Sequence, residues 1–147
     1  MQSQSILHRI FDAAFNQGNL TAIDELVSHK SITHTTNWGM PAGRMGLKQL
    51  IAMLRTAFPD LHCTVEDEIN QDDKVAAHWT MRGTHQGRFL GNTPTSKSIA
   101  VQGLIYARIE NKQVIESWIM IDQMSALQQL GLIPPPLRPS SPTPAES

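Results

Sequence analysis

The sequence predicts an α+β domain in which helices pack on one face of a largely antiparallel sheet. Apolar residues recur at helical spacing up to about residue 57, and beyond Pro59 the period changes to the alternation that is typical of strands. A short helical segment then follows the last strand. Because the helices precede the strands instead of alternating with them, the order favours α+β over a parallel α/β sheet.

The predicted helices are bounded by residues that cap or break helices. Ser3 or Ser5 can cap the first helix, and Thr21 followed by Asp24 resembles a capping box for the second. Pro59 stops the third, because proline cannot continue a helix. The helices are expected over about 3–17, 21–27, 44–57 and 123–130.

The strands are predicted from β-branched residues and from alternation. Asn111-Lys112 is a plausible two-residue hairpin turn between the last two strands. The segment 84–96 is rich in Gly, Pro and Thr and is expected to be a loop. The strands are expected over about 31–36, 61–70, 74–83, 97–110 and 113–122.

Composition limits the class of protein. The chain has 147 residues, a formal net charge of −1 and a pI of about 6.6, so we expect one domain and no nucleic-acid or membrane partner. Cys63 is the only cysteine, which excludes an internal disulfide and favours the cytoplasm. We expect the domain to cover 1–132, followed by a disordered Pro/Ser-rich tail over 133–147.

The last strand ends at Asp122. Side chains alternate across a strand, so Trp118, Met120 and Asp122 share one face, and this mixture is unusual for a merely solvated surface. If the sheet curls, that face becomes a concave apolar wall that carries one carboxylate. Asp122 also stands just before a predicted helix and could be its N-cap. Both roles stay open, and they do not exclude each other.

The register of the last hairpin decides which side chains surround Asp122. In a regular hairpin Ile105 lies opposite Trp118, and Val101 opposite Asp122. Asp122 then lies near Val101, Gly103 and Ile105, and such poorly hydrated surroundings raise a carboxyl pKa towards the range of a general base. A one-residue bulge would change the partners. In that register the residues sharing the face of Asp122 are Gln102, Tyr106 and Arg108.

Three segments, 43–69, 74–99 and 108–131, resemble SnoaL-like polyketide cyclases. The resemblance rests on AFPDL, on GTHQG followed by PT, and on W-x-x-x-D before QQLG. It implies an α+β cone with a strongly curved sheet around a cavity, and frequent homodimers. It also implies that an aspartate near the end of the last strand is the acid/base of an aldol ring closure, a position that Asp122 matches. The turn Asn111-Lys112 departs from the Asp-Gly turn that is usual in this family.

Further site residues follow from this reading. His34 could polarise a carbonyl or orient Asp122, and Trp38 could belong to a lid over the cavity. His78 could be a polar pocket residue or a dimer contact, and His85 could touch ligand from its loop or lie on an exposed turn. Beside the catalytic candidates Asp122 and His34, the expected pocket residues are Phe15, Trp38, His78, His85, Val101, Gly103, Ile105, Trp118 and Met120.

The sequence therefore predicts an acid/base cyclase for an apolar carbonyl ligand. No cofactor is expected, because no glycine-rich nucleotide motif is present. No metal is expected either, because the six histidines show no His-x-His or Glu-x-x-His spacing. The alternative is a module of the same fold that binds a small molecule or assembles without catalysis, since fold does not fix function.

Overall fold

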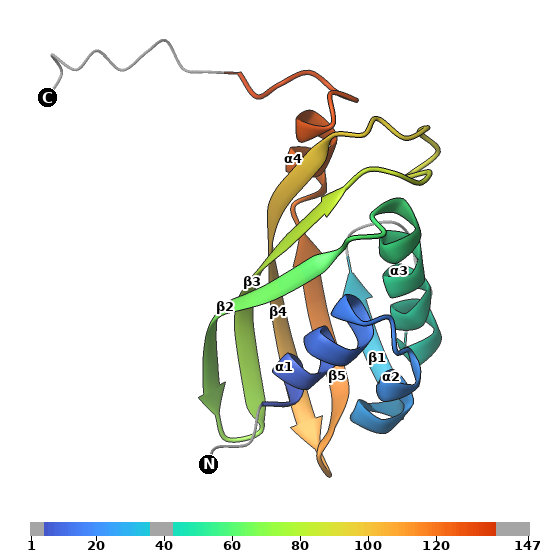
Figure 1. Ribbon diagram of the computed structural model, residues 1–147. Helices are drawn as coiled ribbons and strands as arrows, with labels where there is room; N and C mark the ends of the chain where they lie inside the picture. The colour runs from blue at the N-terminus through green and yellow to red at the C-terminus, as the bar shows by residue number, and fades with distance from the viewer. Residues whose placement is uncertain (1–4, 36–42, 138–147) are drawn as a thin grey trace, which may run out of the picture.

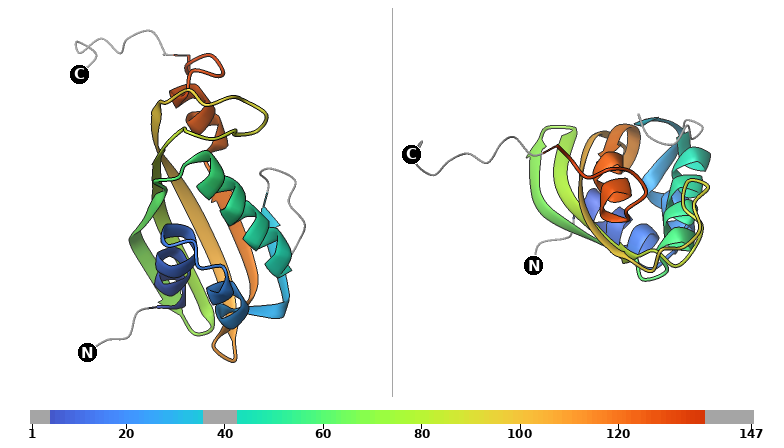
Figure 2. Two further views of the ribbon diagram at one scale, coloured as in Figure 1. Left: turned by 45° about the vertical axis from the view of Figure 1, so that its right-hand side comes forward. Right: turned by 90° about the horizontal axis from the view of Figure 1, so that it is seen from above.

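The computed structural model describes residues 5–35 and 43–137, which form a layer of helices on one face of a five-stranded sheet (Figures 1 and 2). The predicted α+β class is confirmed. Trp38 and residues 138–147 of the predicted tail lie outside the described residues. The elements are α1 (Ile6–Ile10), η1 (Phe11–Asn16), α2 (Thr21–Leu26), β1 (Val27–Thr35), α3 (Gly43–Ala57), β2 (His62–Gln71), β3 (Lys74–Thr84), β4 (Ser98–Glu110), β5 (Gln113–Ile121) and α4 (Gln123–Gln129).

The sheet is mixed and mainly antiparallel, with strand order β1-β5-β4-β3-β2. Strands β2 to β5 pair antiparallel with their neighbours in sequence, whereas β1 joins the edge of β5 in parallel. Seen from above in Figure 2, the sheet curves around the helices, which lie on its inner side. We call the side that carries α1, η1, α2 and α3 the inner face and the opposite side the outer face.

The helix boundaries confirm most of the sequence predictions. Ser5 caps α1, since its hydroxyl accepts the backbone N–H of His8 at 3.2 Å. The predicted capping box at Thr21 is wrong: Leu20 is the N-cap of α2, and Thr21 is already helical. The Thr21 hydroxyl donates to the side chain of Asn19 instead, in the turn before the helix.

The β4–β5 hairpin has the predicted turn and a bulged register. Asn111 and Lys112 have φ of 52° and 62°, as a two-residue hairpin of this hand requires. The regular register is wrong, because the pairing shifts between Ile109 and Arg108. Tyr106, not Ile105, lies opposite Trp118.

The bulge is favoured by the side chains that it brings opposite each other and by those that it keeps buried. It brings Arg108 opposite Glu116, and opposite charges on facing strands stabilise the pair. It also keeps Ile119 and Ile121 on the inner face, where both are buried. A one-residue slip would turn them to the other face.

The inner face is filled by the hydrophobic core. Trp79 and Phe11 are at most 1% exposed, and their ring centroids are 4.8 Å apart. Gly103 is needed beside them: a Cβ there would lie 2.5 Å from two ring atoms of Trp79. Other buried residues on this side include Leu7, Phe15, Leu47, Leu50, Ile51, Leu54, Met81, Val101, Ile105, Ile119 and Ile121.

Candidate functional site

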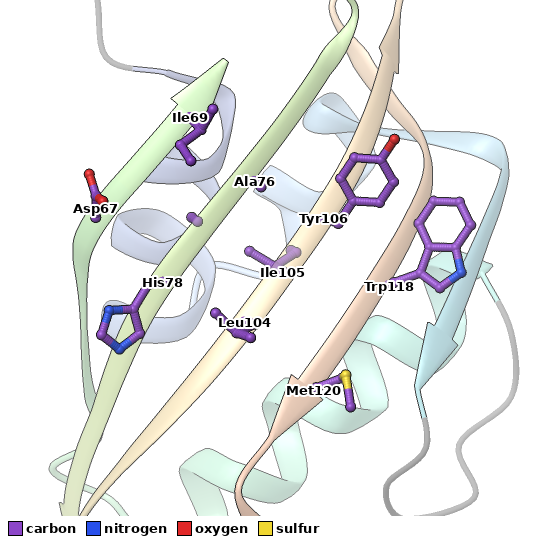
Figure 3. A pocket seen from close by; sticks show the side chains of 10 residues that line it. Asp67, Ile69, Ala76, His78, Leu104, Ile105, Tyr106, Trp118 and Met120 are labelled. Atoms are coloured by element: carbon purple, nitrogen blue, oxygen red, sulfur yellow. The ribbon is translucent and has the colours of Figure 1, made fainter. Parts of the chain in front are cut away.

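The outer face carries an apolar hollow of about 360 Å³ in the middle of the sheet (Figure 3). Its polar margin is made by Asp67 and His78. Large side chains lie open on it: Leu104 is 58% exposed and Met120 is 55% exposed. Clustered apolar exposure of this kind on a folded chain marks a surface for a ligand or a partner. The apolar lining residues are Ile69, Ala76, Ala77, Leu104, Ile105, Tyr106, Trp118 and Met120.

A second hollow, of about 310 Å³, shares His78, Leu104 and Met120 with the first and reaches Asp122 at the end of β5. Gln102 lies between the two polar ends of this hollow. Its backbone carbonyl accepts the N–H of Asp122 at 3.0 Å, and its side-chain Oε1 lies 2.8 Å from His78 Nε2. Three polar side chains from three neighbouring strands therefore border one apolar depression.

Asp122 is the N-cap of α4. One carboxylate oxygen, Oδ1, accepts the backbone N–H of Ser125 at 3.0 Å, which confirms the predicted capping role. Asp122 is exposed, and the apolar neighbours expected from Val101 and Ile105 are absent from its side because both point to the inner face. The predicted desolvation of the carboxyl by these neighbours is therefore wrong, because they would share its face only in the unbulged register.

His34 lies in a polar cluster at the other end of the outer face. Its Nε2 is 2.8 Å from Glu116 Oε2, and Arg108 donates to Glu116 Oε1 at 2.8 Å. The hydrogen bond with His34, followed by the one from Arg108, lowers the pKa of the Glu116 carboxyl, while burial opposes this shift. The imidazole of His34 also stacks on Trp118, with ring centroids 4.9 Å apart.

His34 does not orient Asp122. It pairs with Trp118, and Asp122 lies four positions further along the chain, just beyond the end of β5, which corresponds to about 13 Å of extended chain. The predicted contact is therefore replaced by the pair of His34 and Glu116. Sequence reasoning missed this cluster, although the opposite charges of Arg108 and Glu116 could have signalled the bulged register.

The remaining predicted pocket residues do not share one face. Trp118, Met120 and His78 line the outer hollow, whereas Phe15, Val101, Gly103 and Ile105 are buried beneath the helices. The buried members of this set therefore belong to the packed core and not to a pocket. For the residues of β4, the cause is again the bulge in β5. Ile105 also borders the first hollow, and Gly103 borders the second, both from within the sheet.

His85 is fully buried, so the expected exposed turn is wrong. Its Nδ1 accepts the backbone N–H of Thr95 at 3.1 Å, which ties together the two ends of the 85–96 loop. Its ring packs near Phe58 and Phe89, at centroid distances of 5.7 and 6.1 Å. In this position His85 holds the loop and does not border either outer hollow.

Cys63 and the metal-binding types of side chain bear on which other chemistry is possible. Burial raises the pKa of the Cys63 thiol to about 12, so it is not a thiolate nucleophile near neutral pH. Within residues 5–35 and 43–137, no three side chains of the types that bind metals gather into a possible metal site. Nor does any helix in these ranges have the length and apolar character to span a bilayer.

Comparison with known proteins identifies the family. The profile of the SnoaL-like polyketide cyclases matches residues 5–130, nearly the whole described chain. The chain belongs to the SnoaL-like polyketide cyclase family. Nogalonic acid methyl ester cyclase of Streptomyces nogalater is 26% identical over 121 residues, which cover 81% of this chain and 90% of the relative.

Solved structures of similar proteins agree with this fold. AclR from Streptomyces galilaeus superposes with a TM-score of 0.78 at 25% identity, covering 90% of this chain and 83% of AclR. IdmH from Streptomyces antibioticus superposes with a TM-score of 0.75 at 28% identity, covering 86% of this chain and 96% of IdmH. A protein with a ketosteroid isomerase-like fold from Catenulispora acidiphila, 18% identical, superposes with a TM-score of 0.74 and supports the fold alone.

Proposed function

We propose that the protein is a cyclase that closes a ring within an apolar, polyketide-like carbonyl substrate, with Asp122 as the general acid/base. The observation that carries this proposal is the position of Asp122. It is a carboxylate at the border of an apolar hollow, at the end of the last strand, in a chain of the SnoaL-like family. The relative from Streptomyces nogalater bears the name of a methyl ester cyclase, which supports the same class of substrate.

The proposed reaction needs no external oxidant or reductant. Asp122 removes a proton from the carbon next to a carbonyl group, and the electrons of that C–H bond form an enolate. The enolate carbon attacks a second carbonyl carbon of the same molecule, forming a C–C bond and an alkoxide. Protonated Asp122 returns its proton to the alkoxide, so the product is an isomer of the substrate and the carboxylate is regenerated.

The hollow contributes orientation. A planar substrate lying over Leu104, Met120 and Trp118 would be held by apolar contact, with its reacting carbons near the end of β5. Bound substrate would also displace water from the border of the hollow. The N-cap bond from Ser125 to Oδ1 would fix the carboxylate while Oδ2 takes the proton.

We test this with Asp122→Asn, using nogalonic acid methyl ester as the trial substrate. Asparagine keeps the size and capping ability of Asp122 but cannot accept the proton, so turnover should collapse while binding and thermal stability persist. Asp72→Asn, in the exposed turn between β2 and β3, is the matched control and should turn over normally. Normal turnover by Asp122→Asn would refute the acid/base role.

We further propose that the protein is a homodimer that buries the outer face. Five strands about 4.8 Å apart span roughly 19 Å, and the nine residues of β5 run about 30 Å, so the face is on the order of 600 Å². That approaches the ~800 Å² per partner of a stable interface. A second copy over this face would also cover the hollow and exclude water from a bound substrate.

Sedimentation velocity tests the dimer with a matched pair of variants. Met120→Lys places a charge in the middle of the outer face, whereas Met45→Lys places it on α3, where Met45 is 63% exposed. The wild type and Met45→Lys should sediment as dimers, and Met120→Lys as a monomer with unchanged circular dichroism. A monomeric wild type at tens of micromolar concentration would refute the proposal.

The second candidate function is a binding or assembly module without catalysis. The observation that favours it is the exposure of Asp122, whose capping bond needs no acid/base chemistry. This reading expects a dimer and ligand binding, with no turnover by the wild type and no effect of Asp122→Asn on affinity. The proposed location in the cytoplasm suits either function and agrees with an unpaired Cys63 thiol.

A further inference from the structure

At the end of the sheet next to α4, strand β4 runs further than its neighbour β5. The last pair of the two strands joins Gly103 to Ile121, and the Asp122 N–H still donates to the Gln102 carbonyl at 3.0 Å. Alternate residues of a strand point their N–H and C=O groups to the same side, so both backbone groups of Ala100 face the side on which β5 lies. Beyond the end of β5, Ala100 therefore presents a donor and an acceptor at a strand edge.

The side chain of Gln129, the last residue of α4, pairs with both of these groups. Its Oε1 accepts the Ala100 N–H at 2.8 Å, and its Nε2 donates to the Ala100 carbonyl at 3.0 Å. The same Nε2 donates to Ser125 Oγ at 2.9 Å. The amide has one orientation, because a backbone N–H can only donate and a carbonyl can only accept. Figure 1 shows α4 beside this end of β4, where the carboxamide takes the place of a peptide group of the neighbouring strand.

These contacts lead from Gln129 to the carboxylate of Asp122. Ser125, which accepts from Gln129, is also the residue whose backbone N–H donates to Asp122 Oδ1 at 3.0 Å. Helix α4 is thus attached to β4 at both ends, at its start by Asp122 and at its end by Gln129. With only the first attachment the helix could turn about its start, and the Ser125 N–H would move with it.

The apolar contacts of α4 do not replace the second attachment. Ala126 and Leu130 are each 1% exposed and hold the helix against the core. Hydrophobic contact is not directional, so it sets how close the helix lies without fixing its rotation. Hydrogen bonds depend steeply on angle, so the paired carboxamide does fix it.

We infer that Gln129 is a positioning residue for Asp122. By pairing with Ala100 it holds α4, and through the Ser125 N–H it holds the plane of the carboxylate from which Oδ2 exchanges a proton with the substrate. The inference rests on the proposed acid/base function and adds one residue to it. Gln129 acts through Asp122 and not on the substrate itself.

A purely local role for Gln129 predicts a different outcome. If its carboxamide only covers the edge of β4, its loss exposes the backbone of Ala100 and leaves the carboxylate of Asp122 in place. If it positions Asp122, its loss misplaces a reacting group, and a shift of about 1 Å can cost on the order of 10² in rate. Gln129 itself is exposed, so replacing it leaves the core intact and both outcomes can be measured in the folded protein.

The kinetic test compares Gln129→Met with Gln128→Met. Methionine has a similar length and a similar helix propensity but cannot pair with a peptide group. With nogalonic acid methyl ester, Gln129→Met should lower kcat about tenfold or more with a much smaller change in KM. Gln128→Met, the same change one position earlier in α4, should leave both values as in the wild type. A kcat of Gln129→Met within twofold of the wild type overturns the inference.

An NMR test needs no substrate and decides the matter if that ester is not turned over. Because the Ser125 N–H donates to Asp122 Oδ1, its proton resonance should shift as the carboxylate is protonated between about pH 7 and pH 3. In Gln129→Met this shift should fall to less than about half of the wild-type value, because the charge-assisted bond is lost. In Gln128→Met it should be unchanged.

A shift in Gln129→Met above half of the wild-type value overturns the inference, since the carboxylate then keeps its partner without Gln129. Undiminished turnover by Asp122→Asn instead refutes the proposed function alone. The two failures are distinguishable, because the resonance of Ser125 reports the coupling of Gln129 to Asp122 whether or not the protein turns over an ester.

Discussion

The two faces of this sheet are built from the same strands but differ in what covers them. On β4, Gly103 faces Trp79 in a core without room for a Cβ, while its neighbour Leu104 is 58% exposed in an apolar hollow. The helices bury the apolar side chains of the inner face, whereas apolar side chains on the outer face stay exposed. The difference teaches that the two apolar hollows lie on the face that α1, η1, α2 and α3 leave uncovered.

The largest expected difference between the faces is at their tryptophans. Trp79→Ala should lower the free energy of unfolding by about 3–5 kcal/mol, because it empties a fully buried site beside Phe11. Trp118→Ala, which removes a half-buried ring that contacts His34 and Tyr106, should cost about 0.5–1.5 kcal/mol. Urea denaturation measures both values, and equal losses would break the comparison.

Neighbouring residues on β4 should show the same contrast on a smaller scale. Gly103→Ala forces a methyl group against Trp79 and should cost about 1–3 kcal/mol through overpacking. Leu104→Ala removes an exposed side chain and should change monomer stability by no more than about 0.5 kcal/mol. The comparison is made in urea at low protein concentration. A larger loss for Leu104→Ala than for Gly103→Ala would contradict the assignment of faces.

Two substitutions of Asp122 separate its contribution to stability from its proposed role in catalysis. Asp122→Ala removes the N-cap of α4 and should cost about 0.5–2 kcal/mol, whereas Asp122→Asn retains a capping oxygen and should cost much less. Thermal unfolding followed by circular dichroism compares the two variants. If both lose the same stability, the bond from Ser125 to Oδ1 is not what stabilises the helix end.

The smallest expected effect is the pH dependence contributed by Glu116. Its pKa is lowered from 4.5 by His34 and Arg108, so the folded state holds the carboxylate more readily than the unfolded state does. The resulting stabilisation is present above about pH 4.5 and is lost as the pH falls through the lower, folded pKa. Solvent and salt screen this exposed cluster, so the effect should be modest.

The measurement for Glu116 is Tm against pH for the wild type and Glu116→Gln at low salt. The wild type should be the more stable protein near neutral pH, and the difference should shrink in acid. Glu110→Gln, at the hairpin end of β4, is the matched control and should lack this trend. A difference that grows as the pH falls would show that the sign is wrong.

Several parts of the fold followed from local signals. Ser5 capped the first helix, and Asn111-Lys112 made the turn, because each depends on residues within a few positions in the chain. The capping box at Thr21 failed because Leu20 already starts that helix. A short window of sequence also predicts Asp122 as the N-cap of the last helix, although the strand before it ends at Ile121.

By itself the sequence determined the α+β class, the order of elements, the family and the position of Asp122, because helical period, strand alternation and short motifs are local properties. Only the tertiary structure decided that Asp122 shares a face of the sheet with Gln102 and not with Val101. Along β4 both alternating sets contain large apolar residues, Ile105 on one side and Leu104 and Tyr106 on the other, so hydrophobicity did not choose the register. The register was decided by pairing across the strands. One bulge brings Arg108 opposite Glu116 and keeps Ile119 buried under the helices.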